Sequence, residues 1–174
     1  MSVVSNDIKI YLSWGAGNTD PNASLGWVIS STEVVDNTLN NLFDNVSWVE
    51  HTSWDINYRC IYVKNTNATD TAYNSRIFID SNTIAVDDTI NIGKDLAWVG
   101  NGATTGVADT ITDEHTAPDP AVTFTTAVDY VNAILLTDIP AGSCHAVWIK
   151  RIVSAGTTAQ ANDEATLKVS VDTI

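Results

Sequence analysis

Basic residues are scarce in this chain of 174 residues. Eight Lys and Arg stand against 21 Asp and Glu, which gives a formal net charge of −13. A chain of this charge repels polyanions and can neutralise few phosphates, so nucleic acid is not an expected partner. The same charge disfavours binding to an anionic membrane surface.

Long apolar runs are missing as well. The chain has no stretch of about 18 consecutive apolar residues, so the sequence predicts no bilayer-spanning helix. Residues 1–7 lack both a basic start and an apolar stretch, so no Sec-type export signal is expected. With 44% hydrophobic residues the chain can still build a core, and its length suits one domain.

Cysteine and histidine are too few and too scattered for a recognisable metal or redox motif. Cys60 and Cys144 form no C-x-x-C pair, and we interpret them as small buried residues within strands. Whether they form a disulfide depends on whether their strands are neighbours. His51, His115 and His145 show neither H-x-H nor H-E-x-x-H spacing, so no zinc site is predicted.

Catalytic motifs are also lacking. Ser143 is not part of a G-x-S-x-G elbow, and Cys144 and His145, as neighbours in a strand, point to opposite faces. The glycine-rich residues 100–106 precede no amphipathic helix and are interpreted as a loop rather than a phosphate cradle. We therefore predict no enzyme activity and no cofactor.

Acidic side chains gather in and near the long loop predicted over residues 100–120. We interpret them as solvated loop residues and predict no metal, although irregular calcium binding stays open because no EF-hand pattern is present. These acidic residues are Asp109, Asp113, Glu114 and Asp119 in the predicted loop, and Asp87 and Asp88 earlier in the chain.

What is abundant is typical of β-structure. Asp, Asn and Thr favour turns, and Val, Ile and Thr suit a pleated, half-buried surface. About eight short strands separated by turn residues predict an all-β antiparallel β-sandwich, of jelly-roll or Ig-like type. We expect one domain over residues 1–174, with an extended N-terminal arm at 1–7.

Alternating or β-branched segments locate these strands. The predicted strands, with 27–30, 89–92 and 96–99 as shorter candidates, are 8–12, 27–30, 58–64, 75–80, 89–92, 96–99, 122–125, 133–136, 144–153 and 166–171. Strands 58–64 and 75–80 are expected to pair as antiparallel neighbours across the turn between them. Apolar residues at 39, 42, 43 and 46 have helical spacing and predict one short helical turn.

Tryptophan is unusually frequent. Trp148 alternates within a strand and is predicted to lie in the core. Four others, Trp14, Trp27, Trp48 and Trp54, lie in or beside loops rich in Gly, Asn and Ser. Their rings could stack on sugars, anchor a protein interface, or fold back as a minor cluster under the loops.

Several segments resemble small virion structural proteins of tailed bacteriophages. The resemblance is carried by Asp7–Ser13, Asn18–Gly26, Tyr58–Asn65, Asp138–Gly142 and Ala146–Arg151, and it concerns residue texture rather than one diagnostic motif. It implies a β-sandwich subunit located in the virion, of the capsid decoration (cement) kind. The implied partners are the major capsid protein or other virion subunits, and copies of the chain itself in a trimer.

For such a subunit we expect contacts through surface anchors rather than through a pocket. The candidate interface residues are those of the N-terminal arm, Ser2, Val3 and Val4 among them, together with Trp14, Trp27, Trp48 and Trp54. Two rival hypotheses remain: a carbohydrate-binding or structural module of the neck, tail or baseplate, and a glycosidase or esterase on a β scaffold.

Overall fold

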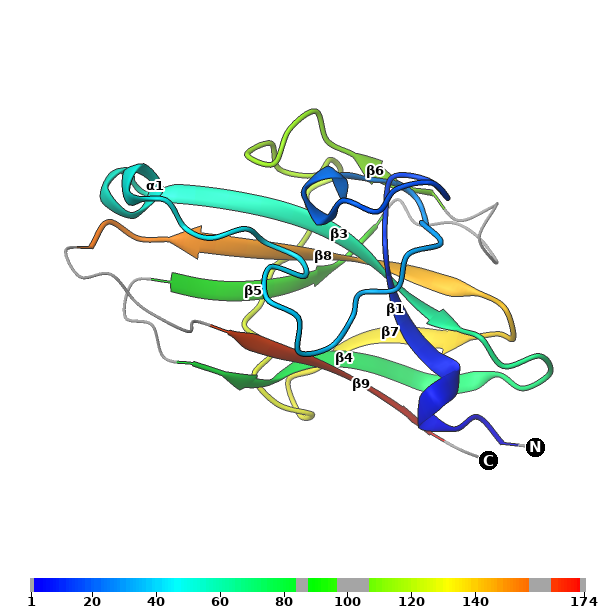
Figure 1. Ribbon diagram of the computed structural model, residues 1–174. Helices are drawn as coiled ribbons and strands as arrows, with labels where there is room; N and C mark the ends of the chain where they lie inside the picture. The colour runs from blue at the N-terminus through cyan, green and yellow to red at the C-terminus, as the bar shows by residue number, and fades with distance from the viewer. Residues whose placement is uncertain (1, 84–87, 97–106, 157–163, 173–174) are drawn as a thin grey trace.

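The computed structural model describes residues 2–83, 88–96, 107–156 and 164–172, which form an antiparallel β-sandwich (Figure 1). In chain order the elements are η1 (Ser5–Asp7), β1 (Ile8–Leu12), η2 (Pro21–Ala23), β2 (Gly26–Val28), α1 (Trp48–Ser53), β3 (Asp55–Asn65), β4 (Ala72–Asn82), β5 (Asp88–Lys94), β6 (Val107–Thr110), β7 (Ile134–Ile139), β8 (Cys144–Val153) and β9 (Ala165–Asp172). The predicted all-β class is confirmed, and the bounds of β1 and β8 match the predicted strands.

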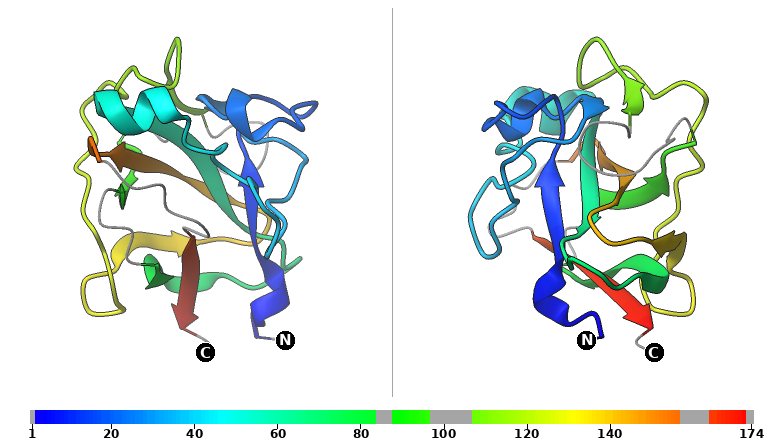
Figure 2. Two further views of the ribbon diagram at one scale, coloured as in Figure 1. Left: turned by 60° about the vertical axis from the view of Figure 1, so that its left-hand side comes forward. Right: turned by 90° about the vertical axis from the view of Figure 1, so that its right-hand side faces the viewer.

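The strands form two principal sheets and one small ribbon. The first sheet has the order β1-β3-β8-β5 and the second the order β7-β4-β9, while β2 pairs with β6 alone. Figure 2 shows the second sheet on one side of the first, with the β2–β6 ribbon and α1 on its other side. The β1-β3-β8-β5 sheet is therefore the middle layer of the molecule.

Because the middle sheet is covered on both sides, its central strands are apolar on both faces. Along β8, Cys144 and Trp148 join a cluster on the outer side, whereas Val147 and Ile149 join the cluster between the two sheets. A strand that is buried on both faces forms a nearly continuous apolar run. This explains why residues 144–153 were predicted so clearly from the sequence.

The inner core lies between the two principal sheets. Ile61 and Val63 of β3 pack there against Ile77 and Ile79 of β4 and Leu136 of β7. The outer core contains Tyr58, Cys60, Tyr62, Trp148 and Ile111, and the prediction that Trp148 lies in the core is confirmed.

The predicted pairing of strands 58–64 and 75–80 is wrong. β3 pairs with β1 and β8, and β4 pairs with β7 and β9 in the other sheet. The physical reason is that β3 has apolar side chains on both faces and is therefore placed in the middle sheet, where both faces are covered. The turn after Asn65 consequently carries the chain from one sheet to the other.

The helical turn predicted over residues 39–46 is also wrong, since these residues form turns and bends. The helix begins later, at Trp48, because Ser47 and Glu50 form a capping box: the Ser47 hydroxyl accepts from the Glu50 amide at 3.3 Å, and the Glu50 carboxylate accepts from the Ser47 amide at 2.5 Å. The Asn residues before Ser47 favour turns instead.

Other predicted segments are corrected in part. The loop predicted over 100–120 contains a strand, β6, because its backbone pairs with β2. Of residues 122–125, only Thr125 joins a ladder, as an isolated bridge to Ile92. The strand predicted over 96–99 and the glycine-rich residues 100–106 lie outside the described residues, apart from Leu96.

The N-terminal arm is shorter and less extended than predicted. Residues 5–7 form the 3-10 helix η1, and Val3, with 3% of its surface exposed, packs into the inner core of its own subunit. Ser2 and Val4 remain exposed. Val3 is apolar and is therefore stabilised by burial within its own chain, which removes it from the set of exposed contact residues.

Candidate functional site

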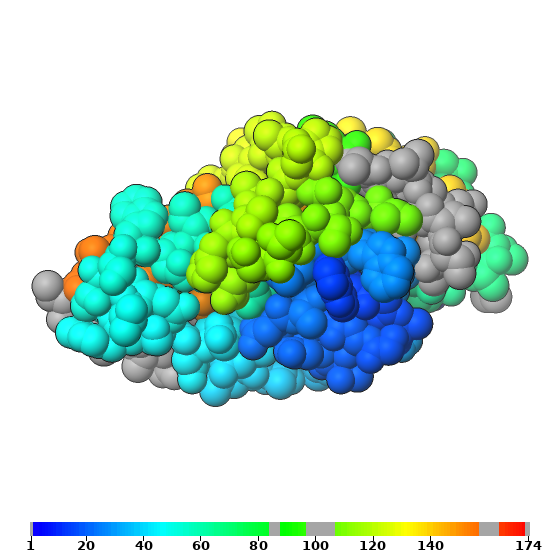
Figure 3. Space-filling view, turned by 90° about the horizontal axis from the view of Figure 1, so that it is seen from above, coloured from blue at the N-terminus to red at the C-terminus, as the bar shows by residue number. Residues whose placement is uncertain are grey.

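An outer layer of three segments covers the far side of the middle sheet. We define the outer layer as residues 13–30, 44–55 and 107–120; it includes η2, β2, α1 and β6. Seen from above, these segments adjoin on one surface, in blue, cyan and yellow-green (Figure 3). All four candidate tryptophans lie in the outer layer.

A tyrosine hydroxyl of the middle sheet connects the β2–β6 ribbon to it. The Tyr62 hydroxyl donates to the backbone oxygen of Trp27 in β2 and accepts from the amide of Ala108 in β6 at 2.9 Å. Burial raises the pKa of Tyr62 well above its usual value, so this hydroxyl stays protonated. One side chain thus holds both strands of the ribbon at a fixed distance from β3.

Asp95 makes a second connection of this kind. It has 2% of its surface exposed, and its Oδ2 atom accepts from Trp148 Nε1 at 2.7 Å and from the Asp109 amide at 3.1 Å. The indole of the outer core and the backbone of β6 are therefore bound to the same carboxylate oxygen. A hydrogen bond to a charged acceptor is stronger than one between neutral groups.

A buried arginine connects two segments of the outer layer. Arg59, with 1% of its surface exposed, donates from one terminal nitrogen to Asn22 Oδ1 at 2.8 Å and to Glu114 Oε2 at 2.5 Å. Its other terminal nitrogen donates to the Tyr58 backbone oxygen at 3.1 Å. A buried guanidinium needs such partners, because an unpaired buried charge is strongly destabilising.

A second buried arginine holds the segment before α1. Arg151 donates twice to Asn57 Oδ1, at 2.9 and 3.0 Å, and once to the Asp44 backbone oxygen at 2.6 Å. The guanidinium groups of Arg59 and Arg151 both lie over the Phe43 ring, 5.3 and 4.9 Å from its centroid. These cation–π contacts fix residues 43 and 44 beside the middle sheet.

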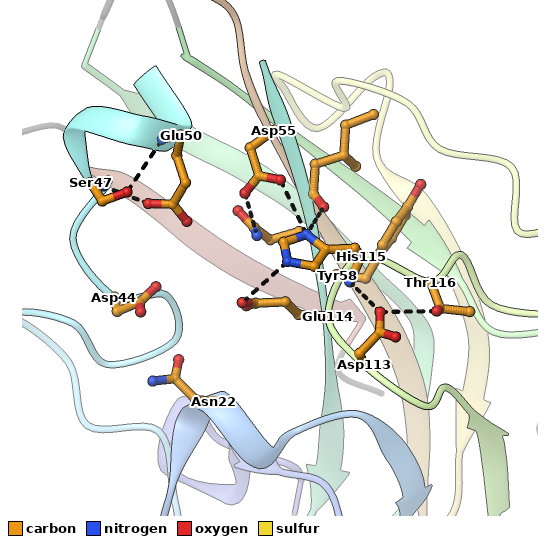
Figure 4. Close-up of polar contacts among 12 residues, drawn as sticks. Asn22, Asp44, Ser47, Glu50, Asp55, Tyr58, Asp113, Glu114, His115 and Thr116 are labelled. Carbon is orange, nitrogen blue, oxygen red and sulfur yellow. Dashed lines mark hydrogen bonds and ion pairs between the residues drawn. The ribbon is translucent and has the colours of Figure 1, made fainter. Parts of the chain in front are cut away.

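His115 lies where the second and third segments of the outer layer meet (Figure 4). Its Nδ1 atom lies 3.1 Å from both the Ile56 backbone oxygen and Asp55 Oδ1, and its Nε2 atom lies 3.8 Å from Glu114 Oε1. Partial burial lowers the pKa of His115, but the hydrogen bond to Ile56 and the nearby carboxylates outweigh burial and raise the pKa on balance. Protonated His115 therefore tightens this junction.

The four candidate tryptophans are exposed. The exposed fractions are 39% for Trp14, 49% for Trp27, 66% for Trp48 and 57% for Trp54. Trp14 and Trp27 contact each other edge to face, with ring centroids 6.3 Å apart. Trp48 and Trp54 lie at the two ends of α1, where Trp48 also contacts the ring of His51 at 5.9 Å.

Three of these tryptophans have an unusual backbone. The φ angles are 77° at Trp14, 63° at Trp27 and 62° at Trp54, in the region that favours glycine. A bulky residue with positive φ costs about 1–2 kcal/mol relative to an ordinary conformation. Such residues persist where the surrounding structure enforces them, and they are enriched at functional sites.

Gly26 shows why the chain bends sharply before Trp27. Its φ is +99°, and a Cβ atom built on it would lie 1.7 Å from the backbone oxygen of Asp109. Only glycine allows β2 to approach β6 this closely. The glycine therefore sets the position from which the Trp27 ring projects.

The two cysteines lie in the core and not at the exposed surface of the outer layer. Cys60 and Cys144 are fully buried, and burial raises the pKa of both thiols, to about 11 for Cys144. They form no disulfide, because the register places Cys60 opposite Trp148 and Cys144 opposite Lys64. The prediction that both are small buried residues is confirmed.

The histidines and acids serve structural roles. His145 is buried, which lowers its pKa to about 4 and keeps it neutral at pH values near 7. Asp113 accepts from the His115 amide and the Thr116 hydroxyl, both at 3.0 Å, so it stabilises a loop. Within the described ranges no three His, Cys, Asp or Glu side chains are grouped so as to hold a metal, and Asp87 lies outside them. No helix among those same residues is long and apolar enough to cross a bilayer.

The residues that build the outer layer were only partly visible in the sequence. The tryptophans were identified, and Glu114 was named among the acidic loop residues, but Arg59, Arg151 and Asp95 were not singled out. The available signal was a positive charge inside each of two apolar strands, at positions where burial requires a partner. The sequence matches no protein-family model and no curated protein.

Proposed function

We propose that this chain is a non-enzymatic structural subunit of a tailed-phage virion, a capsid decoration protein that binds and stabilises the assembled shell. Its partners in this proposal are the major capsid protein, other virion subunits and further copies of itself in a trimer. The outer layer is the binding surface.

The observation that carries the proposal is the set of exposed tryptophans on strained backbone. Trp27 and Trp54 each have about half of their surface exposed although their φ angles disfavour any large side chain. Glycine would relieve the strain at both positions, so the isolated subunit retains these two indoles at a cost in backbone conformational energy. Large aromatic side chains at rigid, exposed positions are typical of the residues that contribute most to protein interfaces.

The remaining chemistry agrees with a binding role. The thiols are buried with raised pKa values, so thiolate nucleophiles are disfavoured. The buried arginines and Asp95 connect structural elements to one another. Their contacts stabilise the outer layer against the middle sheet and so give it the rigidity that binding surfaces benefit from.

The test uses shells assembled without this subunit, to which the purified protein is added back. The double variant Trp27→Gly/Trp54→Gly should fold but occupy shells about tenfold less well than the unmodified protein. The matched control, Leu39→Ser/Val131→Ser, removes two apolar side chains that are more than 80% exposed and lie outside the outer layer. Equal occupancy by the tryptophan variant and the unmodified protein would contradict the proposal.

A second candidate function is carbohydrate binding on the neck, tail or baseplate. It is favoured by the exposure of Trp48 and Trp54 at the two ends of α1, because exposed indole rings can stack on sugar rings. Tryptophan fluorescence titrated with a panel of oligosaccharides distinguishes the two. A saturable change that is lost in Trp54→Gly would support carbohydrate binding, whereas the decoration role predicts no saturable response.

A further inference from the structure

Charge is distributed unevenly over the molecule. The outer layer contains eight acidic residues and no Lys or Arg, whereas all eight Lys and Arg of the chain lie in other segments. The eight acids are Asp20, Asp44, Glu50, Asp55, Asp109, Asp113, Glu114 and Asp119. Only part of this negative charge is neutralised within the subunit.

Three of the eight carboxylates face a positive or protonatable group. Glu114 pairs with Arg59, Asp44 lies 3.6 Å from a terminal nitrogen of Arg151, and Asp55 contacts His115. For the other five, the described part of the chain contains no ion pair with Lys or Arg. These five carboxylates give the surface its negative potential.

Most of these carboxylates are held in place by the backbone. Asp20 accepts from the Asn22 amide at 2.9 Å, and Asp109 accepts from the Asp119 amide at 2.5 Å. Hydrogen bonds from Thr116 and the His115 amide lower the pKa of Asp113. The negative charges are therefore fixed in position rather than carried on mobile side chains, which reduces the entropy lost when a partner binds.

Exposed tryptophans lie on the same elements as these carboxylates or on elements paired with them. Trp27 is in β2, which pairs with the β6 strand that contains Asp109, and Trp48 is in α1 together with Glu50. A guanidinium or ammonium group is attracted both by carboxylates and by the face of an indole ring. Negative charge beside exposed tryptophan is thus complementary to one kind of protein surface.

We propose that the outer layer binds a protein surface rich in arginine and lysine. This inference rests on the proposed function and adds to it the chemistry of the partner. The complementary charges steer the encounter, and the indoles provide contact area once the cationic side chains are in place. Binding should therefore weaken as salt is added, because exposed charges are screened within about 10 Å at 0.1 M salt.

The chain offers a charge-matched pair of variants for the test. The outer-layer variant is Asp20→Asn/Asp113→Asn/Asp119→Asn, and the control is Asp129→Asn/Asp138→Asn/Asp172→Asn in or beside the other principal sheet. All six side chains are exposed, and asparagine keeps an oxygen that can accept a hydrogen bond. Both variants change the net charge equally, so they separate the position of charge from its total.

The probe is a fluorescein-labelled peptide of repeated Arg-Gly-Gly units, with a citrulline peptide of the same sequence as its neutral counterpart. Fluorescence anisotropy should show binding of the arginine peptide, about tenfold weaker for the outer-layer variant and changed less than about twofold for the control. Trp54→Gly should weaken binding too. Equal weakening in both charge variants, or equal binding of both peptides, would overturn the inference.

The same variants added to shells separate this inference from the proposed function. If the unmodified protein and the outer-layer charge variant occupy shells equally, and occupancy does not respond to salt, the decoration role stands and the basic partner is wrong. If the unmodified protein fails to bind shells, the proposed function itself is wrong. Thermal unfolding checks that each variant is folded. If the triple variant unfolds, it is replaced by Asp20→Asn/Asp119→Asn, which leaves the Asp113 loop intact, and Asp129→Asn/Asp138→Asn becomes the charge-matched control.

Discussion

The two clusters on either side of the middle sheet are built differently. The inner cluster, between the principal sheets, consists of aliphatic side chains such as Ile61, Ile77 and Leu136, each fully buried. The outer cluster is closed by polar connections, those of Tyr62 and Asp95. The inner cluster therefore stabilises the fold through non-directional burial, whereas the outer layer is fixed in a defined position by directional hydrogen bonds.

The largest effect is expected in the inner cluster. Ile77→Ala should lower the free energy of unfolding by about 4 kcal/mol, because it removes buried methyl groups and leaves a cavity between rigid sheets. Urea denaturation measures the loss. Amide exchange should rise throughout the molecule, and a change confined to the outer layer would contradict the central role assigned to this cluster.

The buried His145 should make the whole fold sensitive to acid. Burial lowers its pKa from 6.5 to about 4 in the folded chain. The fold therefore has its full stability above pH 6.5, where His145 is neutral in the folded and the unfolded chain, and it loses stability as the pH falls toward 4. Between pH 7 and 4.5 the loss should be about 2–3 kcal/mol. His145→Gln should remove this part of the pH dependence in urea titrations, and an unchanged dependence would contradict the assignment.

Gly26→Ala addresses the outer layer alone. The added methyl group cannot fit beside the backbone oxygen of Asp109, so β2 must separate from β6 at a cost of about 2–3 kcal/mol. Gly17→Ala, where no atom lies within 4 Å of the new carbon, is the matched control. Hydrogen exchange should rise in β2 and β6 while β4 and β9 stay protected; loss of protection in all four would contradict the separation of the two clusters.

A smaller effect is expected for Tyr62→Phe. The variant keeps the ring but leaves the Trp27 oxygen and the Ala108 amide without their partner, which should cost about 1–2 kcal/mol. Tyr11→Phe, which removes a hydroxyl from β1, serves as the control. Near-ultraviolet circular dichroism should show altered tryptophan signals in Tyr62→Phe, since the ribbon that holds Trp27 is loosened.

The smallest effect has the opposite sign. Trp54→Gly should raise the free energy of unfolding by about 1 kcal/mol, because glycine relieves the positive φ at an exposed position. Trp48→Gly, at the start of α1, should lower it by a similar amount because glycine is a poor helix former. Thermal unfolding of the two variants side by side measures the difference, and destabilisation by both would argue against backbone strain at Trp54.

How much of this could be predicted from the sequence depended on the range of the interactions. Strand β8 was predicted at its observed bounds because its apolar run and flanking turn are local signals. The choice of partners was not predictable, since whether β3 pairs with β4 or β8 depends on which faces are covered in the folded molecule. The start of α1 was predictable in principle, because Ser47 and Glu50 have the spacing of a capping box.

Sequence reasoning identified the tryptophans of the candidate site, but not the tertiary contacts that hold the outer layer in place. Loop composition around Trp27 and Trp54 left open whether their rings are exposed or fold back under the loops, and Val3 was assigned to a free arm although it packs into the core. The contact of Arg59 with Glu114 joins residues 55 positions apart, and no pattern in one sequence specifies such a pair. Sequence patterns identify what is apolar or turn-forming, but tertiary contacts determine what is held rigid.

The position of β8 in the middle sheet has a consequence for synthesis on the ribosome. β8 lies between β3 and β5, both of which precede it in the chain by dozens of residues. Until Cys144–Val153 has left the exit tunnel, β3 and β5 lack their shared neighbour, and their apolar faces stay open to solvent. Assembly of the sandwich therefore waits for β8 to emerge, and the nascent chain is a natural substrate for chaperones until β8 is inserted.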